Sequence, residues 1–120
     1  VAATQAFLLA TKPQHMREAV LQLKAAGLAP ETPLISMAAG VTTDAIRGWV
    51  EDSNPVVRAM ANTPCLVRQG AIALCINQGG DETHLALAEW LLSSVGMVLR
   101  APESQFDALT ALAGSGPAFA

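Results

Sequence analysis

The sequence predicts an α/β fold built around an open, mostly parallel β-sheet. Short, almost continuous apolar runs are typical of strands buried on both faces, and here they alternate with segments whose apolar residues recur at helical spacing. The chain is 52% hydrophobic and only 14% charged, whereas about 25% of the residues of an average domain are charged. This composition excludes a disordered segment. A length of 120 residues allows one domain at most, or part of one.

The first half of the chain supplies three strands and two helices in alternation. Pro13 stands where the first turn of a helix is expected, and Gly27 ends that helix. Thr42 or Thr43 can cap the second helix, which Pro55 terminates. The predicted elements are a strand at 5–10, a helix at 13–26, a strand at 34–38, a helix at 42–49 and a strand at 56–60. This order is typical of parallel strands joined by crossover helices.

The second half continues the pattern. A strand is predicted at 71–76 and a short one at 97–99, with helices at 82–95 and 103–113. Asp81 is the expected N-cap of the helix at 82–95, whose apolar residues lie on nearly every side, so we expect it to be buried on more than one side. Trp49 and Trp90 are interpreted as packing residues. Four acidic residues are expected on solvated helix starts, namely Asp81, Glu82, Glu103 and Asp107.

Charge and residue usage exclude several kinds of partner. The net charge of −3 gives no basic field for nucleic acid. No uncharged apolar run reaches the about 18–20 residues that span a bilayer, and no signal peptide is visible, so we expect a cytoplasmic protein. Cys65 and Cys75 fit neither a redox nor a zinc pattern and are expected to be reduced. His15 and His84 are expected to be solvated, and no metal site is predicted.

Three predicted strands end in similar short turns. These are residues 10–13, 37–40 and 60–64, which we call the first, second and third strand tips. Ligands of open α/β sheets bind at the carboxyl ends of strands. Small residues there let a flat ligand approach the backbone, and Lys12 and Asn62 add polar groups. Each tip alone is also compatible with an ordinary turn. The glycines of residues 114–116 do not form a dinucleotide fingerprint, because Phe119 replaces the last glycine and a helix precedes them.

Together these segments resemble pyrroline-5-carboxylate reductase, the last enzyme of proline biosynthesis. The resemblance is carried, in order, by Leu-Ala-Thr-Lys-Pro-Gln at 9–14, Ile-Ser-Met-Ala-Ala-Gly at 35–40, Val-Arg-Ala-Met-Ala-Asn-Thr-Pro at 57–64, Leu-Leu-Ser-Ser-Val-Gly at 91–96 and Gly-Ser-Gly-Pro-Ala at 114–118. It implies a partial Rossmann-like fold. Residues 1–101 would be the second half of the NAD(P)-binding domain, and residues 102–120 the hinge and the start of a helical dimerisation domain.

The resemblance implies hydride transfer from NADPH or NADH to 1-pyrroline-5-carboxylate, a small-molecule substrate, giving proline. The implied cofactor-binding residues are Ala10, Thr11, Lys12 and Pro13 on the ribose and diphosphate side, Met37, Ala38 and Ala39 near the nicotinamide, and Asn62. No catalytic residue is identified, and Thr110 is the nearest hydroxyl candidate. A homodimer or larger homo-oligomer, assembled through the C-terminal domain, is also implied.

Two other functions stay open at this point. One is another Rossmann-type NAD(P)-dependent reductase, and the other is a non-catalytic nucleotide-binding module. The sequence does not distinguish NADH from NADPH, and we expect the segment alone to be inactive.

Overall fold

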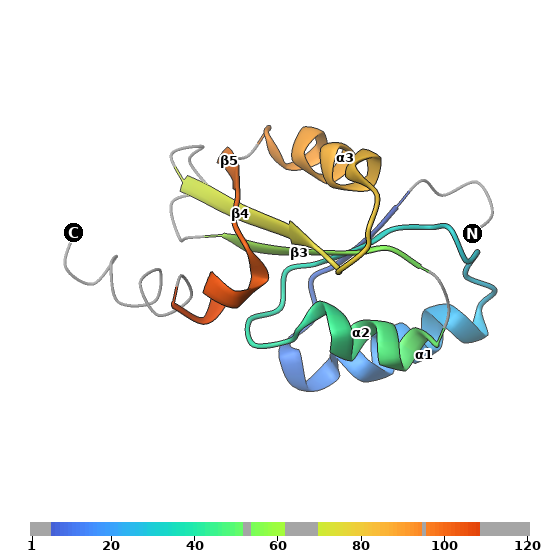
Figure 1. Cartoon of the computed structure of the whole chain (residues 1–120). Coiled ribbons are helices and arrows are strands. Elements are labelled where there is room, and N and C mark those ends of the chain that lie inside the picture. Colours follow the sequence, from blue (N-terminus) through green and yellow to red (C-terminus); the bar gives the residue numbers. More distant parts are fainter. Residues whose placement is uncertain (1–5, 52–53, 62–69, 95, 109–120) are drawn as a thin grey trace.

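The computed structural model describes residues 6–51, 54–61, 70–94 and 96–108. Its five strands form one sheet in the order β1-β2-β3-β4-β5 (Figure 1). Their bounds are β1 Phe7–Leu9, β2 Leu34–Ser36, β3 Val56–Ala61, β4 Gly70–Ile76 and β5 Gly96–Arg100. Strands β1, β2 and β3 are parallel, β4 is antiparallel to β3, and β5 is parallel to β4. The predicted open, mostly parallel sheet is therefore confirmed.

Helices cover both faces of this sheet. They are α1 Met16–Ala25, α2 Thr43–Val50 and α3 Glu82–Leu92, with the short 3-10 turns η1 Pro13–His15 and η3 Glu103–Gln105. Figure 1 shows α1 and α2 together on one face and α3 on the other. This layering explains the continuous apolar runs, because neighbouring strand residues point to opposite faces and both faces are covered.

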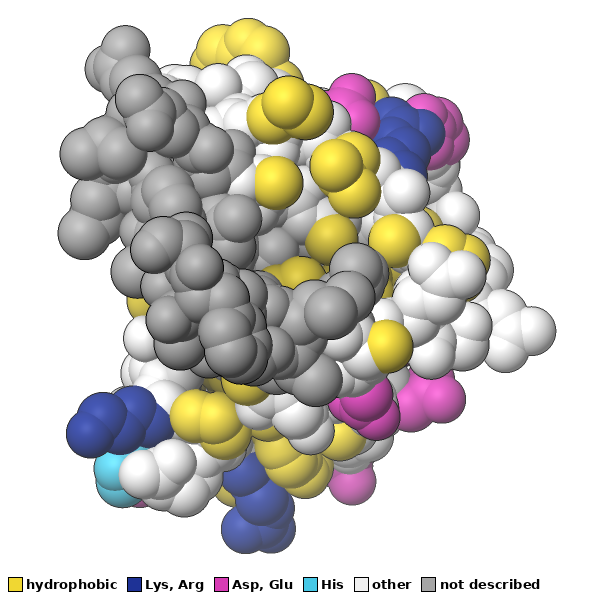
Figure 2. All heavy atoms as spheres, turned by 90° about the vertical axis from the view of Figure 1, so that its left-hand side faces the viewer, with side chains coloured by type: hydrophobic (Ala, Val, Ile, Leu, Met, Phe, Trp, Pro, Cys, Tyr) yellow, Lys and Arg dark blue, Asp and Glu magenta, His cyan; other side chains and the backbone are white. Residues whose placement is uncertain are grey.

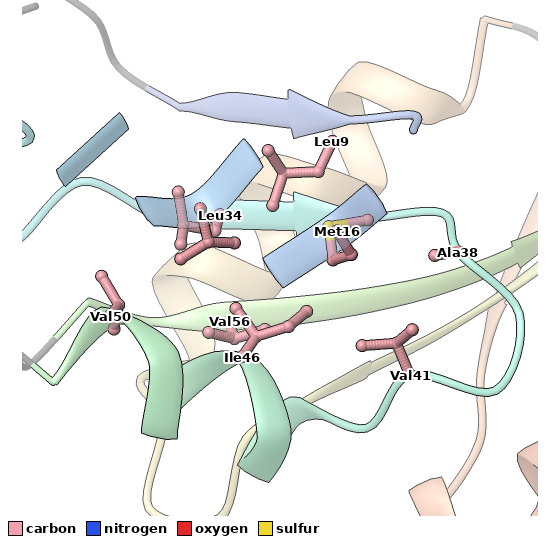
Figure 3. Close-up of a cluster of buried hydrophobic side chains, with 9 residues drawn as sticks. Leu9, Met16, Leu34, Ala38, Val41, Ile46, Val50 and Val56 are labelled. Atoms are coloured by element: carbon pink, nitrogen blue, oxygen red, sulfur yellow. The ribbon is translucent and has the colours of Figure 1, made fainter. Parts of the chain in front are cut away.

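The two faces have separate apolar clusters. The cluster under α1 and α2 is drawn in Figure 3 and contains Leu9, Met16, Val20, Leu34, Ala38, Val41, Ile46, Val50 and Val56. The cluster under α3 contains Ile35, Val57, Ala59, Ile72, Leu74, Leu85, Ala88 and Leu92. Leu34 and Ile35 are adjacent in sequence but belong to different clusters, as expected for a strand between two layers.

Two predicted helix starts are confirmed by their caps, whereas the helix predicted at 13–26 begins with η1 and has no side-chain cap. The Thr42 hydroxyl accepts from the Ala45 N–H at 3.1 Å, and the Asp81 carboxylate accepts from the Thr83 N–H at 2.9 Å. Helix α3 ends at Leu92 instead of residue 95, and the hydroxyl of Ser93 donates to the carbonyl of Trp90 at 2.8 Å. This bond satisfies a carbonyl that the end of the helix leaves free.

Two expectations about burial are wrong. Helix α3 is buried on one side only, and Trp90 is 72% exposed, because α3 packs on β3, β4 and β5 and nothing described covers its outer side. Leu8 of β1 is 55% exposed. It pairs in register with Ile35, whose side chain lies on the α3 side, and α3 packs mainly on β3, β4 and β5 instead of on β1. No helix in the described ranges has the length and apolar character to span a membrane.

The C-terminal part of the described chain starts as predicted. Turn η3 begins at Glu103, and residues 106–108 continue as helix. The remainder of the predicted helix at 103–113 and the glycine-containing joint lie outside the described residues. Phe106 is fully buried and packs with Ala73 and Cys75 of β4.

Candidate functional site

The first two strand tips lie side by side. Strand β1 ends at Leu9 and β2 at Ser36, and these two residues are partners in the parallel ladder. The N–H of Met37 then donates to the carbonyl of Leu9 at 3.0 Å. Residues 10–13 and 37–40 therefore leave the sheet at the same edge. Asn62 and most of the third tip lie outside the described residues.

The first tip presents its side chains to solvent. Ala10, Thr11, Lys12 and Pro13 are all exposed. The Thr11 hydroxyl donates to the Met16 sulfur at 3.8 Å. The backbone of Lys12 is extended, and its carbonyl accepts from the His15 N–H at 2.9 Å, which starts η1. Within the described part of the chain, no carboxylate forms an ion pair with Lys12.

The second tip offers mainly backbone. Met37 is half-buried on the α3 side, and Ala38 is buried in the opposite cluster, so the methyl group of Ala38 points into the core. Ala39 and Gly40 are exposed. Gly40 has φ +75°, a left-handed conformation that a residue with a Cβ adopts at a cost. The chain thus turns sharply here with little side-chain bulk.

Figure 2 looks onto this edge. Its lower part, on the side of the sheet that α1 and α2 cover, carries basic side chains and also acidic ones. An anionic ligand that lies along the edge would meet favourable charge at the first tip.

A buried ion pair lies behind the second tip, and the sequence reasoning missed it. Arg58 of β3 is 3% exposed, and its Nη1 lies 3.3 Å from an Oε atom of Glu103. The same carboxylate accepts from the N–H of Thr43 at 2.8 Å and from its hydroxyl at 2.6 Å. Glu103 was expected on a solvated helix start, which is wrong. Asp107 is 95% exposed, as expected, and lies 4.0 Å from Arg58.

A signal for this pair was present in the sequence. Arg58 stands inside a predicted buried strand, and a buried guanidinium needs a partner. The sequence gives no means of choosing Glu103 among the acidic residues.

The remaining titratable candidates are the two histidines and the cysteines. His15 is exposed and His84 half-buried, and no group of three metal-binding side chains occurs among the described residues. Burial and, to a smaller extent, the charge of Glu103 raise the pKa of the Cys75 thiol to about 11. Cys75 is free, as expected. Cys65 and Thr110 lie outside the described residues.

Three parallel strands joined by crossover helices, with the loops after β1 and β2 leaving the sheet at one edge, form part of a Rossmann-like fold. Solved structures agree. A pyrroline-5-carboxylate reductase from Coxiella burnetii is 37% identical, with a TM-score of 0.88 over 98% of this chain and 44% of its own. The reductase from Plasmodium falciparum with NADP bound is 28% identical, with a TM-score of 0.81 over 93% of this chain and 44% of its own.

The curated relatives give the same family. The pyrroline-5-carboxylate reductase of Pseudomonas aeruginosa is 43% identical over 99% of this chain and 44% of its own length. That of Arabidopsis thaliana is 36% identical over 93% of this chain and 40% of its own length. No family model matches the sequence. The chain is thus a homologue of part of the pyrroline-5-carboxylate reductases, and it spans less than half of the length of these relatives.

The same fold also occurs at low identity elsewhere. A prephenate dehydrogenase from Aquifex aeolicus is 13% identical, with a TM-score of 0.72 over 96% of this chain and 45% of its own. That likeness concerns the fold alone.

Proposed function

We propose that this chain is part of an enzyme that reduces 1-pyrroline-5-carboxylate to L-proline with NADPH or NADH. The observation that carries the proposal is the hydrogen bond between Met37 and Leu9, which sets the first and second tips side by side at the carboxyl edge of the sheet. The identity of 43% to a pyrroline-5-carboxylate reductase over 99% of the chain supports it.

The residues present at this edge fit a nicotinamide dinucleotide. Ala39 and Gly40 are exposed and carry little bulk, which leaves room for a flat ring beside the backbone. Lys12 is a free cation within the described chain, and a cationic side chain suits a diphosphate. Ala10, Thr11, Lys12 and Pro13 would hold the ribose and diphosphate. Met37, Ala38 and Ala39 would lie along the nicotinamide, with Ala38 contributing its backbone, and Asn62 would complete the pocket.

Chemistry at this site consists mainly of positioning. The cofactor supplies the hydride, and the chain's own residues orient it against the C=N carbon of the substrate. An imine is reduced readily once it is protonated, so precise placement is the main task of this segment. We propose that, among the hydroxyl groups of this segment, that of Thr110 lies nearest to the substrate.

The domain organisation follows from the same proposal. Residues 1–101 would form the second half of the NAD(P)-binding domain, and residues 102–120 the hinge into a helical domain that joins two or more copies. This chain covers 44% or less of the two relatives quoted above, which leaves length in them for such a further domain. We propose a cytoplasmic location for the enzyme.

The proposal is tested on the full-length protein that carries this chain. Oxidation of NADPH and NADH is followed by absorbance, with and without 1-pyrroline-5-carboxylate, and proline is quantified as the product. We expect substrate-dependent oxidation with one proline formed per cofactor oxidised. Cofactor binding without any proline formation would instead favour another reductase of this fold or a binding module.

A further inference from the structure

One carboxylate joins three elements that are distant in the sequence. Glu103 of η3 accepts two hydrogen bonds from Thr43, which lies 60 residues earlier at the start of α2. It also pairs with Arg58 of β3. The Glu103 side chain is only 27% exposed, and the Arg58 side chain is almost completely buried. The carboxylate is therefore held in one place from two sides.

The contact with Thr43 fixes the start of α2. The first N–H groups of a helix have no partner inside the helix, and the positive end of the helix dipole lies there. Thr42 caps the Ala45 N–H, while Glu103 takes the Thr43 N–H at 2.8 Å. A carboxylate from outside the helix thus takes one of the free N–H groups at its N-terminus and places a negative charge beside it.

The start of α2 is also the end of the second tip. Residues 37–42 run from β2 to α2, and the N–H of Met37 is bonded to Leu9 at their beginning. At their end, the bonds from Thr43 to Glu103 hold them. Between these anchors lie the exposed residues Ala39 and Gly40. The geometry of this segment therefore depends on a residue that lies beyond the last strand of the sheet.

We propose that Glu103 is a positioning residue for the cofactor, acting through Thr43 on the second tip. The inference rests on the proposed function, because it assigns the second tip to the nicotinamide. Glu103 does not touch the cofactor in this proposal. It holds the backbone of residues 37–42 in the shape that the nicotinamide requires.

Two functions of Glu103 are separable by substitution. Pairing with Arg58 keeps a buried guanidinium neutralised, which concerns stability. Hydrogen bonding to Thr43 concerns the second tip. Glu103→Gln removes the charge but keeps an amide oxygen for the Thr43 N–H, whereas Glu103→Ala removes both. Asp107→Asn is the matched control, because Asp107 is an exposed acid of the same segment with no bond to α2 in the described structure.

The experiment measures the dissociation constant of NADPH and the thermal midpoint of the full-length protein carrying each variant. We expect Glu103→Ala to weaken NADPH binding about tenfold, as the loss of a hydrogen bond to a charged group would. We expect Glu103→Gln to bind within about threefold of the wild type, although its midpoint falls as the Arg58 pair is lost. Thr43→Val keeps only the backbone hydrogen bond to Glu103, and we expect its dissociation constant for NADPH to lie between those of the two Glu103 variants. Asp107→Asn should change neither quantity.

Binding is measured far below each midpoint, so that unfolding does not contribute. The proposal is overturned if Glu103→Ala binds NADPH like the wild type, or if the Gln and Ala variants lose affinity equally. Failure of the proposed function has a different signature, since wild-type protein would then form no proline whatever the variants bind.

Discussion

The guanidinium of Arg58 lies over the ring of Phe106, with 4.9 Å between its central carbon and the ring centroid. Phe106 is fully buried and Arg58 nearly so. Attraction between a cation and an aromatic face is stronger when both groups are shielded from water. Strand β3 is thereby joined to the segment that follows β5.

This stack predicts an unequal response to the removal of each charge. We expect Arg58→Met to lower the free energy of unfolding by less than about 2 kcal/mol, because an apolar chain still packs on the ring and Glu103 can be hydrated. Among the described residues, Glu103→Ala leaves the buried guanidinium with only the distant Asp107, and we expect a loss of about 3 kcal/mol. Urea denaturation of the full-length protein measures both. A larger loss in Arg58→Met would contradict the interpretation.

The raised pKa of Cys75 leads us to expect a loss of stability in alkaline solution. Its pKa is about 11 in the folded chain against 9.0 for an unperturbed thiol. The unfolded state therefore releases its proton first, and stability falls as the pH rises from about 9 to about 11. We expect the urea midpoint of the wild type to fall more steeply over this range than that of Cys75→Ala. Parallel pH profiles would refute the assignment.

Ala39→Leu separates a cofactor site from ordinary packing. Ala39 is exposed at the second tip, so a larger side chain there meets no packed core. We expect NADPH binding to weaken at least tenfold while the thermal midpoint stays close to that of the wild type. If Ala39 were a packing residue, overpacking would cost about 1–3 kcal/mol of stability and leave affinity unchanged. Calorimetric titration and melting of the same sample decide between the two.

Lys12→Ala tests the charge at the first tip. Under the proposed function, the apparent KM for the cofactor rises, and the difference from the wild type grows as salt is removed, because screening weakens a charge–charge contact. Arg17→Ala is a suitable control, since Arg17 is an exposed cation in the first turn of α1 and outside the tip. An identical KM at every salt concentration would leave only the backbone of Lys12 in the site.

At position 51 we expect glycine to give a more stable protein than alanine, although alanine is usually the better residue in a helix. Glu51 ends α2 with φ +54°, the left-handed conformation, and its carboxylate pairs with Lys24 of α1 at 3.3 Å. Left-handed backbone costs about 1–2 kcal/mol in any residue with a Cβ, whereas an exposed ion pair adds at most about 1 kcal/mol. We expect Glu51→Gly to be about 1 kcal/mol more stable than Glu51→Ala. Equal unfolding midpoints would argue against left-handed strain at this position.

The order of strands and helices could be predicted from the sequence because each element carries its own periodicity. Thr42 and Asp81 cap helices where expected. The exposure of Leu8 and Trp90 could not be predicted from local pattern. That of Leu8 depends on which strands α3 covers, and that of Trp90 on whether anything described packs on the outer side of α3. The first two tips were predicted because parallel strands end at one edge. The ion pair between Arg58 and Glu103 could not be predicted, because the two residues are far apart in the sequence and local patterns carry no information on such contacts.

The bonds between Thr43 and Glu103 also bear on the order in which the chain assembles. A ribosome has made strands β1 to β3 and the helices between them well before residue 103 appears. Local contacts form early, whereas a contact across 60 residues must first overcome the entropy of closing that loop. The Thr43 N–H at the start of α2 can therefore bind Glu103 only after β5 has been synthesised and the chain that follows it lies beside α2. The second tip is accordingly anchored at both ends only late in the synthesis of this segment.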